Sequence, residues 1–524
     1  MRTSQLLKAN RGYEKIKKNN KLELIDELKN QLTNTKLFKK NSTFSCLNTN
    51  SIGIDLEIIA RQFILNRYVG ISFNREILKV FSNSNYKFCL PIPLIWLKVL
   101  SNNGVRVNYI FSLSIWYIEM LKLFAYSSYE ILRQCKRSLI SIFNNELKKS
   151  TYVYFDSLTE SNLPSINSTN NYGIISWYLK WKNENTVDYF AHSVPNKSKI
   201  LLNESIVVQY VKSPFPPPAK FIILIQFVIF SIIKSFQSLI FLFIGKWWNI
   251  LLLREFLLGE VVNLNKKNGL ATHYLFHNSN WIYRPVWTYI AEKMGSEISF
   301  YFYSTNIERF KKGQKHAIAV NNSWELITWS KILVWDEYQK SFLNNNVIHE
   351  NEIEIVGPIS FQASKQSTIK LPIKSIAIFD VQPVRTSYYI SLGLDQEYYI
   401  PQIVNTFLTD VIECIKITGL NAVFKRKREI GKLAHSQYTN NLNHLVKNNS
   451  FINIDPSIPA EEIIEKCVAT ISLPFTSTAI VAKHMGKPSI FYDPSGLVVM
   501  DDPAAHGIRI INNKNDLKDW LNTI

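Results

Sequence analysis

Three hydroxyl residues, Thr476, Ser477 and Thr478, stand side by side between an apolar segment and a helical one. The apolar residues at 468–473 predict a buried strand, and the spacing after Ser477 predicts a short helix. Hydroxyls in this position either cap the helix or, with the N–H groups of its first turn, bind an anion. One cap needs one hydroxyl, so three favour an anion site, and these donors suit a phosphate in particular.

Polar and cationic residues follow two other predicted strands, at 375–381 and 421–427. Because the carboxyl ends of parallel strands open at one edge of a sheet, the loops after all three strands should meet there. Arg and Lys would neutralise the phosphate, although a solvated turn is the alternative for the basic run. The residues predicted to bind a substrate at this edge are Gln382, Pro383, Arg385, Lys425, Arg426, Pro474, Thr476, Ser477 and Thr478.

Two residues in the first part of the chain are candidates for a catalytic base. Asp156 ends or follows a β-branched and aromatic run at 151–159, and His277 follows the apolar run at 271–276. Histidine is the usual base near neutral pH, although a lone histidine is more often structural. Three further residues are predicted near the substrate, with a helix cap or a core hydrogen bond as the alternative: Arg284, Tyr303 and Asn306.

Strands and helices alternate regularly from about residue 271 onwards, which indicates parallel, doubly wound sheets. The Gly-Pro pair at 357–358 predicts a hinge between two such units. We therefore divide the chain into a basic lead-in at 1–50, an α/β domain at 51–355 and a second α/β domain at 356–524. The two domains are expected to face a cleft.

The most apolar stretch of the chain lies within 217–250. Lys234 interrupts it near the middle, and Lys220 and Lys246 flank the apolar run. A bilayer-spanning helix needs roughly 20 apolar residues, and a lysine at the bilayer centre costs about 2.5–3.5 kcal/mol. The pattern favours a helix or helical hairpin that lies in one leaflet or dips into it. A buried core helix and a single full span are the alternatives.

Composition narrows the classes of partner. The 524 residues carry a net charge of +19, which favours nucleic acid, an anionic membrane face or phosphorylated substrates. The five cysteines form no C-x-x-C pair, and the start of the chain lacks an apolar core of signal-peptide length. The sequence also lacks the G-x-G, D-x-D and H-E-x-x-H patterns. A dinucleotide fingerprint, a Walker loop and a metal site are therefore not predicted.

The segments LPFTSTA (473–479), GKPSIFYD (486–493) and HGI (506–508) resemble bacterial surface-polysaccharide biosynthesis proteins known by a PFTS motif. The likeness covers about residues 250–510 and implies a GT-B-like glycosyltransferase with two Rossmann-like domains. A looser similarity extends to sialyltransferases and Kdo transferases that use CMP-sugars. Gln382-Pro383 stands where their His-Pro pair would be expected, and Ser477 with Thr476 or Thr478 matches their Ser/Thr pair.

The resemblance implies a metal-independent glycosyltransferase that takes a nucleotide-sugar, with CMP as one option, and needs no other cofactor. The first α/β domain would hold the acceptor, and the second would bind the nucleotide-sugar. The acceptor would be a growing surface polysaccharide or a lipid-linked glycan at the cytoplasmic face of the inner membrane. The basic enzyme would bind the anionic surface of that membrane, peripherally or monotopically. A nucleotide-sugar epimerase of similar fold and a basic membrane-bound scaffold are the alternatives; no nucleic-acid-binding motif is present.

Overall fold

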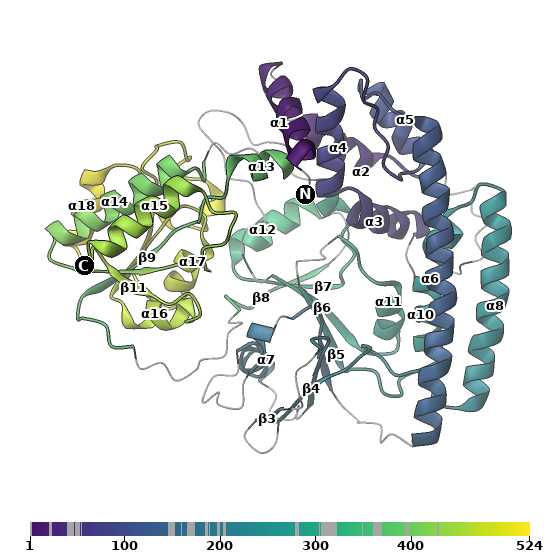
Figure 1. Ribbon diagram of the computed structural model, residues 1–524. Coiled ribbons are helices and arrows are strands. Elements are labelled where there is room, and N and C mark those ends of the chain that lie inside the picture. Colours follow the sequence, from purple (N-terminus) through teal and green to yellow (C-terminus); the bar gives the residue numbers. More distant parts are fainter. Residues whose placement is uncertain are drawn as a thin grey trace.

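The computed structural model comprises a helical part at the start of the chain and two α/β units (Figure 1). It describes residues 3–19, 24–38, 47, 53, 55–144, 152–158, 160–164, 173–183, 187, 189–195, 200–202, 206–277, 282–302, 304, 322–347, 349, 351–359, 369–392, 398–426 and 429–524.

The helical part begins within the segment predicted as a lead-in. Ala9 and Ile16 on the first helix, and Ile25 and Leu28 on the second, are buried. Gly12 lies so close to the fourth helix that a Cβ would collide with the carbonyl of Leu78. The many Lys and Asn residues of this segment hid an apolar stripe at helical spacing. The helices are α1 (Thr3–Lys18), α2 (Leu24–Asn34), α3 (Leu56–Tyr68), α4 (Ile71–Ser82), α5 (Leu94–Asn102) and α6 (Tyr109–Asn144).

In the described part of the chain, the first sheet has eight strands in the order β3-β4-β2-β1-β5-β6-β7-β8, and of their pairings only that of β3 with β4 is antiparallel. Its central strands are buried along their whole length, as parallel strands covered on both faces are. The strands are β1 (Val153–Phe155), β2 (Tyr189–His192), β3 (Ile200–Leu202), β4 (Ile206–Tyr210), β5 (His273–His277), β6 (Glu297–Tyr301), β7 (Lys331–Val334) and β8 (Glu352–Ile355).

Helices follow or precede most of these strands. The unit contains α7 (Ile174–Lys182), α8 (Phe221–Phe243), α9 (Trp248–Leu251), α10 (Leu253–Asn265), α11 (Val286–Lys293) and α12 (Glu337–Asn346), with 3₁₀ turns at η2 (Glu160–Asn162) and η4 (Asn322–Leu326).

The second sheet is parallel throughout, in the order β11-β10-β9-β12-β13-β14. Alternate residues of its first strand pack to opposite sides: Ile378 shares a core with Phe407, and Phe379 shares one with Ile463. The strands are β9 (Ser375–Phe379), β10 (Asn421–Lys425), β11 (Ile452–Ile454), β12 (Ala469–Ser472), β13 (Ser489–Tyr492) and β14 (Arg509–Ile511). The helices are α13 (Thr386–Leu392), α14 (Pro401–Ile417), α15 (Ser436–Lys447), α16 (Ala460–Lys466), α17 (Ser477–His484), η5 (Pro503–Ala505) and α18 (Lys514–Asn522). The prediction of two α/β units with parallel sheets is confirmed.

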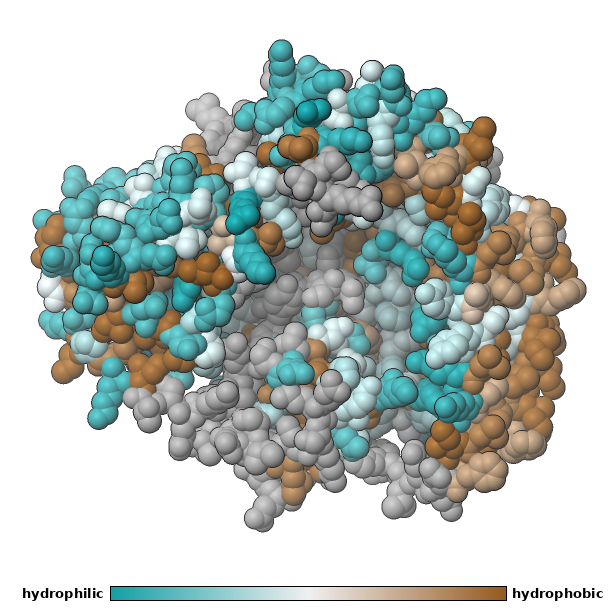
Figure 2. All heavy atoms as spheres, viewed as in Figure 1, coloured by the Kyte–Doolittle hydropathy of each residue, from teal (hydrophilic) through white to brown (hydrophobic). Residues whose placement is uncertain are grey.

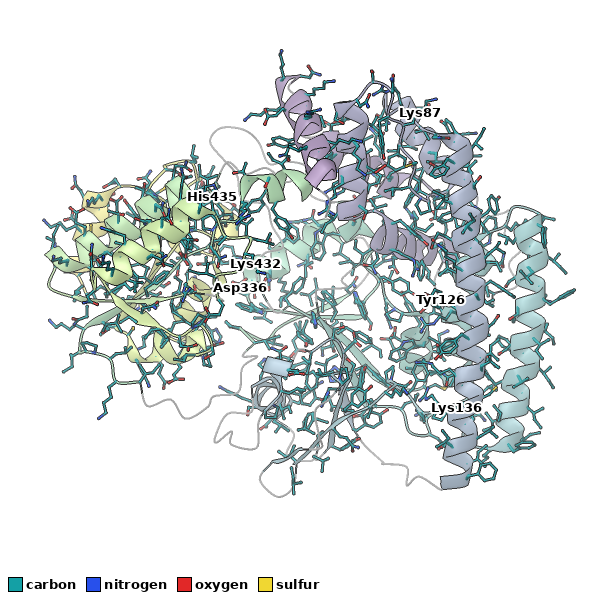
Figure 3. All side chains as sticks on the ribbon, viewed as in Figure 1. Lys87, Tyr126, Lys136, Asp336, Lys432 and His435 are labelled. Atoms are coloured by element: carbon teal, nitrogen blue, oxygen red, sulfur yellow. The ribbon has the colours of Figure 1, made fainter. Side chains whose placement is uncertain are left out.

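The two α/β units touch through a buried polar contact. Nδ1 of His506 lies 2.7 Å from the carboxylate of Asp336, which follows β7. The hydrogen bond from His506 holds the pKa of Asp336 below its ordinary value, against the effect of burial. The helix α13 also packs against α1 and α4 of the helical part. Figure 2 shows that the surface is hollowed between the two units. Figure 3 shows Asp336 of the first unit and Lys432 of the second on the facing sides of the two units.

The apolar segment predicted at 217–250 forms α8, which lies beside α6 (Figure 1). The two helices are antiparallel, because Trp116 near the start of α6 contacts Trp247 after α8, while Arg137 near its end donates to the carbonyl of Phe215 before α8. By length and composition α8 could cross a membrane. Only 22% of its most apolar 18-residue window is buried inside the protein. This low burial contradicts the alternative of a buried core helix.

Candidate functional site

Both sheets have a topological switch point, the place where the strand order reverses. In the second sheet the chain runs from β9 outward through β10 to β11, then returns to β12 and runs outward through β13 to β14. The reversal lies between β9 and β12. In the first sheet it lies between β1 and β5. Ligands of doubly wound sheets bind outside the carboxyl ends of the strands at such points.

The hydroxyl cluster lies directly after β12, at the switch point of the second sheet. The backbone of Phe475 has a φ of +63°, a conformation that costs a bulky residue about 1–3 kcal/mol. This turn leads into α17, whose N-cap is Thr476. The hydroxyl of Thr476 donates to the carbonyl of Leu473 at 3.0 Å and makes no capping bond. The simple capping alternative is therefore not what the structure shows.

Thr476, Ser477 and Thr478 are all half-buried. The hydroxyl of Thr478 lies 3.4 Å from that of Thr476 and 3.3 Å from that of Ser472. The carbonyl of Pro474 accepts a hydrogen bond from Tyr399, which fixes the turn. The first N–H groups of any helix lack intrahelical acceptors. The first turn of α17 thus presents N–H donors next to hydroxyls, and this combination can bind a phosphate.

The loop after β9 lies on the other side of the same switch point. It is tied to the loop after β10, because Pro383 accepts from the N–H of His435 at 2.9 Å and Arg385 donates its N–H to Leu433 at 2.8 Å. The side chain of Arg385 is exposed. The buried Oε1 atom of Gln382 has no hydrogen-bond partner among the described residues. A buried acceptor without a partner is costly, so this atom is a candidate contact for a ligand.

A buried carboxyl, Asp380, is the first residue after β9. It accepts a hydrogen bond of 2.6 Å from the hydroxyl of Tyr438 on α15. Burial raises the pKa of Asp380 to about 6, against the opposing effects of Tyr438 and the Arg426 guanidinium. We predicted the strand to run through residue 381, which placed Asp380 inside it. With the true end at Phe379, the strand-end rule would have selected Asp380, whereas the sequence holds no signal for Tyr438.

The two predicted cations at the end of β10 differ in their surroundings. Lys425 is buried, and its amino group donates to the carbonyls of Arg426 and Pro456 at 3.1 and 3.5 Å. Arg426 is half-buried, and its Nε atom is without a partner among the described residues. The charge of Arg426 opposes the rise that burial causes in the pKa values of Asp380 and Tyr438, so its guanidinium lies near both. Of the two, Arg426 is the one suited to meet an anion.

The two base candidates come together at the switch point of the first sheet. Asp156 follows β1 and His277 ends β5, and the N–H of Asp156 donates to Leu275 at 2.9 Å. Ser157 connects the two: its hydroxyl donates to the Asp156 carboxylate at 2.5 Å, and its carbonyl lies 2.8 Å from Nε2 of His277. Since a carbonyl only accepts, Nε2 carries a proton and donates it. The sequence did not predict that these residues would be adjacent.

Arg284 has a structural environment. Its guanidinium is 2% exposed and donates to Thr288, to the carbonyl of Thr328 and to Glu292, at 3.0, 2.7 and 2.7 Å. It also lies 4.0 Å from the ring centre of Tyr289. Because its donors are used by these contacts, Arg284 makes core hydrogen bonds, which was the alternative to a substrate contact. Tyr303 and Asn306 lie outside the described residues.

Other groupings in the described part of the chain do not resemble a site. Among the described residues, no three His, Cys, Asp or Glu side chains gather in a way that could hold a metal ion. Two pockets, of about 330 and 430 Å³, lie at the amino edge of the first sheet and between α3, α6 and α10. Neither is lined by residues of the loops that follow β1, β5, β9 or β12.

Three comparisons with known proteins bear on this site. No protein in a search of curated sequences matches the chain. Solved structures give distant likenesses with TM-scores under 0.5. UDP-GlcNAc 2-epimerase from Methanocaldococcus jannaschii is 11% identical, with 71% of this chain and 92% of that one covered and a TM-score of 0.35. The wall teichoic acid polymerase TagF is 10% identical, with 77% of this chain and 88% of that one covered and a TM-score of 0.38. Medicago truncatula UGT71G1 complexed with UDP-glucose is also 10% identical, with 67% of this chain and 81% of that one covered and a TM-score of 0.32.

A family model gives the decisive match. The model for polysaccharide biosynthesis PFTS motif proteins matches residues 231–521, more than half of the chain. The four residues of the family's name, Pro474 to Ser477, form the turn and helix start at the switch point of the second sheet. The chain belongs to the family of polysaccharide biosynthesis PFTS motif proteins.

Proposed function

We propose that this protein is a glycosyltransferase that moves a sugar from a nucleotide-sugar to a glycan acceptor. One observation carries the proposal. The N-cap hydroxyl of α17 does not cap its helix, and it lies at a switch point beside two buried polar atoms, Oε1 of Gln382 and Nε of Arg426, that have no hydrogen-bond partner among the described residues. Membership of a polysaccharide biosynthesis family supports the choice of substrate class.

The donor phosphate would lie at the start of α17. The hydroxyl of Ser477 and the N–H groups of the first turn would donate to its oxygens, and the helix dipole would favour its charge. Arg426 and the exposed Arg385 would neutralise the charge that develops on the phosphate as the bond to the sugar breaks. The N–H groups of the helix start are in place before the reaction, and we propose that the stabilisation by these groups needs no metal.

Gln382 would recognise a different part of the donor. Its Oε1 atom is an acceptor, and phosphate oxygens are acceptors too, so this atom suits an N–H of the base or an O–H of the ribose. In the resemblance to transferases with a His-Pro pair, Gln382 would stand where their histidine is expected. An amide in place of an imidazole is compatible with CMP, UDP or GDP as the leaving nucleotide.

The acceptor would be activated at the first sheet. Asp156 would take the proton from the attacking hydroxyl, the new bond would form at the anomeric carbon, and the nucleotide would leave with its phosphate. Ser157 holds the Asp156 carboxylate by a hydrogen bond of 2.5 Å. His277, which shares Ser157 as a partner, is the second candidate for this role.

The test is a donor screen with product analysis. Purified full-length protein is incubated with CMP-, UDP- and GDP-sugars and a membrane extract as the source of acceptor. Transfer predicts a free nucleotide and a labelled glycan, whereas the epimerase alternative predicts an isomeric nucleotide-sugar without any acceptor. If no nucleotide-sugar binds or is consumed, the scaffold alternative holds and the proposal is wrong.

A further inference from the structure

The helix pair α6 and α8 presents a long apolar face to solvent. Figure 2 shows hydrophobic residues gathered over both helices along one side of the molecule. The exposed large side chains of α6 include Ile118, Leu121 and Leu132, which are 49%, 54% and 69% exposed. Those of α8 include Ile232 and Phe236, at 61% and 65%. Folded proteins rarely leave so large an apolar surface without a partner.

The stripe on α6 was not recognised in the sequence, because charged residues interrupt it. Its exposed large apolar residues run from Ile110 to Phe143, a distance of about 50 Å along the helix. This exceeds the roughly 30 Å of a hydrocarbon core. Lys122 and Lys136 lie within the exposed stripe, and Figure 3 shows Lys136 projecting from α6. The stripe is therefore too long and too charged to cross a bilayer, but it suits a helix that lies along its surface.

The packing of α8 leads to the same orientation. Its buried residues occur along the whole helix: Leu224, Phe227, Ser231, Ser238 and Leu242. They face α6 and α10, against which α8 packs. If α8 crossed a bilayer, it would have to leave these neighbours or draw them into the lipid. An orientation parallel to the membrane keeps the buried side against the protein and turns the exposed side to the lipid.

Charge distinguishes a membrane from a second copy of the chain as the partner. The α6 helix contains four Lys and Arg residues and the segment 220–246 contains three, seven together, against two glutamates in α6. Both glutamates are already paired: Glu119 with Lys122, and Glu130 with Arg133 and Arg254. A second copy would thus bring lysines against lysines, whereas anionic headgroups would pair with them.

We propose that α6 and α8 together bind one leaflet of an anionic membrane, with both helix axes parallel to the membrane plane. The sequence analysis predicted membrane association for the segment 217–250 alone, and the proposed surface also includes α6. The inference does not depend on the proposed glycosyl transfer.

The experiment is flotation of the full-length protein with vesicles. We expect binding to phosphatidylcholine–phosphatidylglycerol vesicles, weaker binding to phosphatidylcholine alone, and release by salt or by carbonate at high pH. Leu132→Glu on α6 and Ile232→Glu on α8 should each lower the partition coefficient by about tenfold or more. The matched control is Ile417→Glu, which alters a residue 56% exposed on α14 of the other unit and should bind as the wild type does.

Three results would overturn the inference. Binding unchanged by Leu132→Glu would exclude α6 from the surface. Resistance to carbonate extraction, with labelling of an introduced cysteine at both ends of α8 from opposite sides, would show a span. A dimer in solution that both substitutions dissociate, without any flotation, would identify a second copy as the partner. Circular dichroism of each variant shows whether the fold is retained.

Discussion

Replacing the buried carboxyl at the proposed donor site should change how stability depends on pH. The pKa of Asp380 is raised from 3.8 to about 6, so the folded protein binds this proton more tightly than the unfolded chain does. The stability from this proton is fully present below pH 4 and is lost as the pH rises through 6. At about 1.4 kcal/mol for each unit of pKa, the loss is about 3 kcal/mol at neutral pH.

Asp380→Asn removes the titration and keeps the shape of the side chain. Urea unfolding of variant and wild type, compared from pH 4 to 8, should show the variant gaining up to about 3 kcal/mol relative to the wild type as the pH rises. Tyr438 can still donate to the amide oxygen. As a control, Asp455→Asn should not show this gain, because hydrogen bonds from Ser457 lower the pKa of Asp455. A flat difference for Asp380→Asn across this range would refute the burial of an ionisable carboxyl at this edge.

Two further predictions separate chemistry from structure. Asp156→Asn keeps the contact with Ser157 but removes the proposed base, so kcat should fall about 10²–10⁴-fold while the affinity for the donor is unchanged. Steady-state kinetics and calorimetry measure these two quantities. A normal kcat would exclude Asp156 as the base. Arg284→Met removes a buried guanidinium that serves three acceptors, so the free energy of unfolding should fall by about 3–5 kcal/mol. Nucleotide affinity measured on the folded variant should not change, and its selective loss would return Arg284 to the site.

The sequence was a good guide to which loops follow the strands, although it extended β9 to residue 381 and so missed Asp380. Apolar runs followed by polar residues identified the loops after β9, β10 and β12, and the parallel order brings those of β9 and β12 to one switch point. The same rule selected Asp156 and His277 at the other switch point. Their hydrogen-bonded connection through Ser157 depends on strand register, which a single sequence does not encode locally.

Three features could not be predicted because tertiary packing decides them. Lys425 and Arg284 were selected for their charge, yet the structure surrounds them with carbonyl and carboxylate oxygens. Tyr438 reaches Asp380 from a helix 58 residues later. The apolar face of α6 was hidden, since its buried side is also partly polar, with Ser127 and Gln134 turned inward.

The central claim is that the hydroxyls of the PFTS turn bind the donor phosphate. Calorimetric titration of the nucleotide identified by the donor screen tests it most directly, with Ser477→Ala compared to Ser450→Ala, a half-buried serine before β11 at the opposite edge of the same sheet. Loss of a hydrogen bond to a charged phosphate predicts an affinity about 10–150-fold weaker for Ser477→Ala, with a stability change within about 0.5 kcal/mol. Unchanged affinity for Ser477→Ala, with or without a loss of stability, would contradict it.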